Sequence, residues 1–137
     1  MTEQNMRYAT LDWTQGLCFT CSDSRGHLST IDGDSVTAAS PVTTLLFAAA
    51  ACSGADVVSI LEKKKVKLAK CRIEISGKRR EDYPRRFTEI TMVFHLAGEG
   101  LDRVKAERSV ELSIAKYCSV VATFNPDIPI RTEIVIE

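Results

Sequence analysis

The stretch that decides the fold is residues 40–65, SPVTTLLFAAAACSGADVVSILEKKK. Ser40 followed by Pro41 is typical of a helix start, with a serine N-cap and a proline at the first helical position. The closing lysines suit the negative end of a helix dipole. The residues that share one face at helical spacing are Leu45, Ala48, Ala49, Cys52 and Asp56. The stretch predicts a central helix about 30 Å long, and Gly54 is the point at which it could kink or divide.

Strand patterns flank this helix. Three short strands with intervening turns are predicted before it, at residues 6–13, 17–21 and 27–31. After it, the alternation predicts strands at 66–79, 87–96 and 128–136, with a helix from Asp102 to about Lys116 that breaks and restarts near Tyr117. The order βββ–α–ββ–α–β predicts an α+β fold with mostly antiparallel sheets around a long central helix. We expect one domain over residues 1–137.

Composition narrows the classes of function. The 137 residues are 45% apolar and 26% charged, and eighteen basic side chains balance eighteen acidic ones. This balance gives the chain no overall positive electrostatic field that would attract nucleic acid or an anionic membrane. No run approaches the roughly 18 apolar residues of a spanning helix, and the first residues lack a signal pattern, so a cytoplasmic location is expected. Five cysteines without an export signal indicate free thiols rather than a disulfide scaffold.

Two of these cysteines are candidates for redox chemistry. Cys52 lies within the long helix pattern and Cys118 at the end of the second one, so helix packing could bring their thiols together. If the helix restarts near Ser53-Gly54, free N–H groups would favour a Cys52 thiolate. Asp56, one turn on, would oppose that ionisation unless it is paired. For each thiol, a buried and inert side chain is the alternative interpretation.

Other chemistry-bearing residues point more strongly to structural roles. The CxxC of Cys18 and Cys21 lies in a predicted strand, which sends the two thiols to opposite faces. Cys71 is in phase with core residues, and neither His27 nor His95 has a partner at metal-ligand spacing. A basic hairpin, Arg79-Arg80 to Arg85-Arg86, could bind an anion or support a thiolate, and a solvated turn is the alternative. We find no metal site, phosphate loop or Ser-His-Asp set.

The two cysteine segments resemble those of the OsmC/Ohr family. The motifs that carry the resemblance are Ser40-Pro41-(x)3-Leu45-Leu46-(x)5-Cys52, continued by Asp56-Val57-Val58-(x)-Ile60-Leu61, and Ala106-Glu107-Arg108-(x)2-Glu111-Leu112-Ser113-(x)3-Tyr117-Cys118-Ser119-Val120. Shorter matches are Trp13-Thr14-(x)-Gly16, Ile31-Asp32-Gly33 and Pro84-(x)2-Phe87-Thr88. The likeness covers nearly the whole chain and is strongest to the short OsmC-like branch.

The resemblance implies an intertwined homodimer in which the N-terminal strands of both subunits pair. It also implies a thiol-dependent peroxidase, with Cys52 as the peroxidatic thiolate and Cys118 as the resolving thiol. The implied substrate is an organic or fatty-acid hydroperoxide, and the implied reductant is a dithiol of the lipoyl type. No metal or organic cofactor, nucleic acid or membrane partner is implied.

The chain also departs from the family pattern. A glutamate expected after the helix-opening proline is replaced by the stretch Val42-Thr43-Thr44, and Leu17 follows Gly16 where an arginine is expected. Arg25, Arg80 or Arg86 could supply the missing guanidinium. These departures keep two alternatives open: a small-molecule binding or redox-sensing module with little peroxidase turnover, and a dimeric structural protein whose cysteines merely pack.

Overall fold

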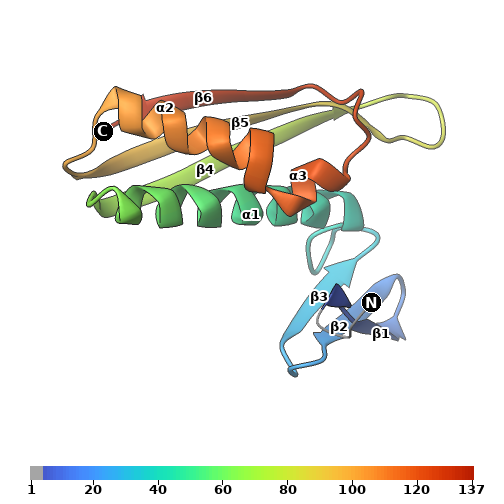
Figure 1. The fold of residues 1–137 in the computed structure, drawn as a ribbon. Coiled ribbons are helices and arrows are strands. Elements are labelled where there is room, and N and C mark those ends of the chain that lie inside the picture. The colour runs from blue at the N-terminus through green and yellow to red at the C-terminus, as the bar shows by residue number, and fades with distance from the viewer. Residues whose placement is uncertain (1–4) are drawn as a thin grey trace. The chain divides into compact units, whose positions relative to one another are not determined.

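The computed structural model describes residues 5–137. The chain forms two compact units, one ending at Leu45 and the other comprising Leu46–Glu137 (Figure 1). Each is described by itself. The α+β class and the βββ–α–ββ–α–β order are confirmed, whereas the expectation of a single domain stays a prediction.

The first unit contains a three-stranded antiparallel sheet in the order β1-β2-β3. Its strands are β1 (Ala9–Gln15), β2 (Cys18–Asp23) and β3 (Leu28–Asp32), close to the predicted ranges. The tight β1–β2 turn uses Gly16 at a φ of 55°, in the left-handed region that favours glycine. After β3, the buried Asp32 carboxylate accepts hydrogen bonds from the N–H groups of Asp34, Val36 and Thr37, which fixes the loop that leads to the long helix.

The long helix, α1 (Pro41–Lys63), starts and ends as the sequence predicts. Ser40 Oγ accepts the Thr43 N–H at 3.1 Å, so Ser40 is the N-cap. The helix runs without interruption through Gly54, so the division considered from the sequence does not occur. A Cβ at Gly54 would lie 2.8 Å from Ile73 Cδ1. The glycine therefore permits close packing of the helix on a strand rather than a break.

The sheet of the second unit has the order β4-β5-β6 (Figure 1). Its strands are β4 (Lys67–Arg79), β5 (Phe87–Glu99) and β6 (Ile130–Ile136). The β4–β5 pair is antiparallel, as predicted for most pairs, but β6 runs parallel to β5. A helical crossover between β5 and β6 makes this direction possible, since parallel neighbours need a long connection.

That crossover contains three helical segments, α2 (Arg103–Leu112), a π-helix (Ser113–Tyr117) and α3 (Ser119–Thr123). Asp102 caps α2 by accepting the Lys105 N–H at 2.8 Å, as predicted. The break predicted near Tyr117 is also confirmed, and it falls at Cys118, between the π-helix and α3.

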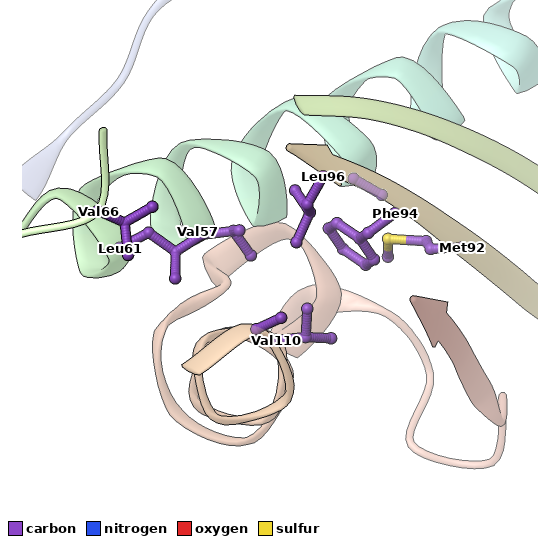
Figure 2. Packing of buried hydrophobic residues seen from close by; sticks show 9 residues of the cluster. Val57, Leu61, Val66, Met92, Phe94, Leu96 and Val110 are labelled. Atoms are coloured by element: carbon purple, nitrogen blue, oxygen red, sulfur yellow. The ribbon is translucent and has the colours of Figure 1, made fainter. Parts of the chain in front are cut away.

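The core lies between one face of this sheet and the two longer helices (Figure 2). Met92, Phe94 and Leu96 alternate along β5 and are buried, as the sequence pattern predicts. They form one cluster with Ala49, Val57 and Leu61 of α1 and with Ala106 and Val110 of α2. On the face of α1 that the sequence spacing picks out, Ala49 is buried, whereas Leu45 and Ala48 are exposed. Packing against the sheet and α2, rather than the helix's own spacing, sets the buried face.

Helix α1 is also long and apolar enough to cross a membrane, with a mean hydropathy of 1.8 in its most apolar window. The expectation that no segment approaches that length was therefore wrong. About 28% of this window is buried inside the structure. A core helix of a soluble protein passes the same test, and α1 places Ala49, Val57 and Leu61 in the core of the second unit.

Candidate functional site

Cys52 and Cys118 meet within the second unit. Cys52 is half-buried near the middle of α1, and Cys118 is buried, 2% exposed, where the π-helix gives way to α3. The Cys52 side chain raises the pKa of the Cys118 thiol, so the two thiols are close enough to interact. The structure thus brings together the two cysteines that the sequence singles out, while their catalytic role stays a prediction.

The two thiols have different surroundings. Burial raises the pKa of the Cys118 thiol to about 11, the N–H of Val121 opposes this rise, and the Cys52 sulfur adds to it. Because this pKa lies far above neutrality, Cys118 carries its proton at physiological pH. Its S–H is then a donor for a thiolate on the more exposed Cys52. The helix restart near Ser53-Gly54, considered from the sequence as a support for a Cys52 thiolate, does not occur, because α1 is continuous.

The direction of Cys118 is fixed by the π-helix before it. The Cys118 N–H donates to the Ser113 carbonyl at 2.7 Å, across a turn one residue wider than an α-helical turn. Such wide turns are rare and frequently occur at functional sites. The turn ends the helix at Cys118 and leaves that residue extended, so that it becomes the N-cap position of α3.

Three polar side chains join the two cysteine segments, and sequence reasoning missed two of them. The buried hydroxyls of Ser53 and Ser113 lie 2.9 Å apart, and Ser113 donates to Asp56 Oδ2 at 2.9 Å. Asp56, expected to disturb Cys52 unless paired, is therefore paired. A signal for Ser113 was available, because it lies on the helix face that includes Ala106 and Val110.

A cavity of about 370 Å³ opens beside this network. Asp56 lies one turn beyond Cys52, and Tyr117 directly precedes Cys118, so the cavity reaches both cysteine segments. The remaining lining residues are Ser59, Ile60, Lys63, Lys64 and Leu112. The cavity thus combines an apolar wall with two ammonium groups at the end of α1, a lining that suits an organic molecule.

The candidate arginines make contacts elsewhere. Arg86 forms a bidentate pair with Asp127 at 2.8 and 3.0 Å, which raises the pKa of Arg86. Arg80 donates to the carbonyls of Asp82 and Tyr83 within its own loop. Arg25 belongs to the β2–β3 turn of the first unit. In the described part of the chain, Arg80 and Arg86 make their hydrogen bonds to the carbonyls of the basic hairpin and to Asp127, not to either sulfur.

The remaining cysteines and histidines make contacts of other kinds. Cys18 and Cys21 lie on strand β2 at positions that face opposite sides, and all five cysteines are free. Cys71 packs against the core, and burial raises the pKa of its thiol. His27 contacts Asp23, and His95 contacts Glu74 and Glu137. Within residues 5–137 no group of side chains could hold a metal ion.

Comparisons with known proteins agree with this architecture. The family model described as OsmC-like protein matches residues 32–133. Protein YhfA of Escherichia coli strain K12 is 41% identical over 113 residues, which cover 82% of this chain and 84% of that protein.

Solved structures extend the comparison. A hypothetical protein from Aquifex aeolicus VF5 is 28% identical, with a TM-score of 0.88 over 97% of both chains. The organic hydroperoxide resistance protein OhrB of Bacillus subtilis is 17% identical, with a TM-score of 0.64 over 96% of this chain and 99% of its own. At that identity the likeness to OhrB shows the fold alone. From the family match and the relative in Escherichia coli, the chain belongs to the OsmC-like family.

Proposed function

We propose that the protein is a thiol-dependent peroxidase that reduces organic hydroperoxides, including fatty-acid hydroperoxides. The observation that carries the proposal is the contact between Cys52 and Cys118, with the buried Cys118 thiol protonated beside the more exposed Cys52. Membership of a family whose solved structures include organic hydroperoxide resistance proteins supports it.

In the first proposed step, the Cys52 thiolate attacks the terminal oxygen of the hydroperoxide. The O–O bond breaks, Cys52 becomes a sulfenic acid, and the leaving alkoxide takes a proton to become an alcohol. The Cys118 S–H interacts with Cys52 and carries a proton that it can donate. Proton transfer from Cys118 would also generate the thiolate that the second step requires.

In the second step, the Cys118 thiolate attacks the Cys52 sulfenic acid. A disulfide forms and the hydroxyl leaves as hydroxide, which becomes water on protonation. A dithiol of the lipoyl type then restores both thiols by exchange. The cycle uses no metal or organic cofactor, and we assign it to the cytoplasm, where such a reductant is available.

A homodimer is part of the proposal. The side chains of Leu11 and Trp13, two positions apart on β1, are 52% and 65% exposed. Exposed apolar side chains gathered on neighbouring positions are typical of an interface. A second copy of the chain would cover them, in keeping with the intertwined arrangement that the family resemblance implies.

The first prediction tests the nucleophile. Purified protein should consume cumene hydroperoxide when dihydrolipoamide is supplied, and Cys52→Ser should abolish turnover because the other thiol of the site, Cys118, is buried and protonated. Cys118→Ser should retain one round of peroxide reduction and accumulate a Cys52 sulfenic acid that dimedone traps. Peroxide loss and mass spectrometry measure these outcomes.

Cys71→Ser is the matched control, because Cys71 is also a half-buried cysteine but lies on β4, outside both cysteine segments. Its turnover should equal that of the unaltered chain. Unchanged activity in Cys52→Ser would remove Cys52 from the mechanism.

A second candidate function is a small-molecule binding or redox-sensing module. The contacts of Arg80 and Arg86 favour it, since neither guanidinium is directed to the thiols in the described structure. Without such a cation the Cys52 thiolate would form and react more slowly. This alternative is favoured if the Cys52–Cys118 disulfide forms normally but Cys52 reacts with peroxide much more slowly than the dithiol reduces the disulfide.

A further inference from the structure

The strongest unassigned feature is the polar chain formed by Ser53, Ser113 and Asp56. Ser53 and Ser113 are fully buried and Asp56 is half-buried beside the cavity. The proton of Ser113 is donated to Asp56, so in the hydrogen bond between the two serines Ser53 is the donor. The order of donation is therefore Ser53 to Ser113 to Asp56.

This chain joins two elements that are distant in the sequence. Ser53 and Asp56 belong to α1, where Ser53 directly follows Cys52. Ser113 is the first residue of the π-helix, and its carbonyl accepts the Cys118 N–H at 2.7 Å. Ser113 thus holds α1 with its side chain and Cys118 with its backbone.

Each buried polar group of this network already has its hydrogen-bond partner. In the described structure every buried side-chain nitrogen or oxygen has a hydrogen-bond partner, and fully buried hydroxyls cannot turn to bulk water for a replacement. Removing one member leaves its neighbour unsatisfied, so the elements must shift to recover a partner. A shift at Ser113 moves Cys118 relative to Cys52, because both contacts start from this residue.

We propose that Ser113, supported by Ser53 and Asp56, is a positioning residue that sets the separation of the Cys52 and Cys118 thiols. The inference rests on the proposed pairing of these thiols, and it assigns the three residues no contact with substrate. Holding two reacting groups in place raises their effective concentration. The network therefore favours the disulfide over the separated dithiol.

The test measures the equilibrium of the Cys52–Cys118 disulfide in the full chain against mixtures of reduced and oxidised glutathione. Oxidised glutathione accepts the two electrons and becomes two reduced molecules as the protein disulfide forms. Peptide mapping by mass spectrometry reports the oxidised fraction. In Ser113→Ala we expect the equilibrium constant for disulfide formation to fall about tenfold, which is a rise in potential of about 30 mV for a two-electron couple.

Ser109→Ala is the matched control. Ser109 is also fully buried, but its hydroxyl donates to the Ala106 carbonyl of its own helix at 2.7 Å. Its loss should leave the equilibrium unchanged. Asp56→Ala should act like Ser113→Ala and keeps the test available if Ser113→Ala does not fold. Asp56→Asn retains an oxygen acceptor and should restore most of the wild-type value.

Equal equilibrium constants for Ser113→Ala, Ser109→Ala and the unaltered chain would overturn the inference, as would a wild-type chain that forms no Cys52–Cys118 disulfide. The measurement needs no hydroperoxide. If the variants behave as expected but cumene hydroperoxide is not consumed, the peroxidase proposal fails while the positioning role stands.

Discussion

At the scale of single residues, Gly54 and Gly98 are two positions at which elements of the second unit approach closely. A Cβ at Gly54 would meet the terminal Cδ1 of Ile73 at 2.8 Å. A Cβ at Gly98 would lie 2.6 Å from the carbonyl oxygen of Lys67, on the backbone of the neighbouring strand. A terminal methyl group can rotate away, whereas the backbone of a paired strand cannot.

Gly98→Ala should therefore destabilise the fold by about 2 kcal/mol, as overpacking of a tight contact does. Gly54→Ala is the control and should cost less than about 1 kcal/mol, because the higher helix propensity of alanine offsets part of the repacking. Urea unfolding followed by circular dichroism gives both values. Equal losses in the two variants would contradict the difference between side-chain and backbone contacts.

At the scale of elements, the parallel edge strand β6 is joined to β4 and β5 by charged side chains. Glu137, just after β6, contacts Lys70 at 2.6 Å and His95 Nδ1 at 2.9 Å. The other ring nitrogen of His95 contacts Glu74 at 2.6 Å. The hydrogen bond from Lys70, followed by that from His95, lowers the pKa of Glu137 below its ordinary value of 4.5.

This shift predicts an acid-dependent contribution to stability. Because the pKa of Glu137 is lower in the folded chain, its contribution is present above the unfolded value of 4.5 and is lost as pH falls through the folded value. Glu137→Gln should be slightly less stable than the unaltered chain at pH 6. The difference in free energy of unfolding between the two chains should disappear as pH falls below about 4.5. The effect is small because the pair is exposed.

Urea unfolding midpoints between pH 3 and pH 6 measure this difference in stability. Glu133→Gln is the control, since Glu133 is on the same strand and forms no ion pair with the residues described here. A gap for Glu137→Gln that persists at pH 3 would argue against the assigned contacts.

The elements also show which features the sequence could predict. The caps at Ser40 and Asp102 and the alternation along β5 are local signals, and all three are confirmed. The direction of β6, the uninterrupted α1 and the exposure of Leu45 depend on contacts with distant residues. The site shows the same division. The two cysteine segments could be recognised in the sequence, but the hydrogen bond between Ser113 and Asp56 depends on how the helices pack.

At the scale of the whole molecule, the apolar side chains left uncovered are the main unexplained feature. Tyr8, Leu11 and Trp13 are more than half exposed near or on β1. A small sheet that leaves such residues open to water gains little from folding on its own. Coverage by a second chain, as proposed above, would supply the missing apolar contacts.

Light scattering after size-exclusion chromatography should therefore give twice the mass of the chain. The double variant Leu11→Asp with Trp13→Asp should shift the protein towards monomer, because carboxylates cannot be buried unpaired in an apolar contact. Val104→Asp, at a residue of α2 that is 76% exposed, is the control and should leave the mass unchanged. A monomeric wild-type chain at micromolar concentration would refute the dimer.

The wide turn between Ser113 and Cys118 has a consequence for how chains of this kind are aligned. The orientation of Cys118 depends on how many residues separate it from Ser113, because the closing hydrogen bond spans the whole π-helix. Inserting or deleting one residue there would rotate the thiol by about 100°, the angle between successive helical residues. An alignment gap inside this stretch therefore marks a different site geometry, even where both cysteines are retained.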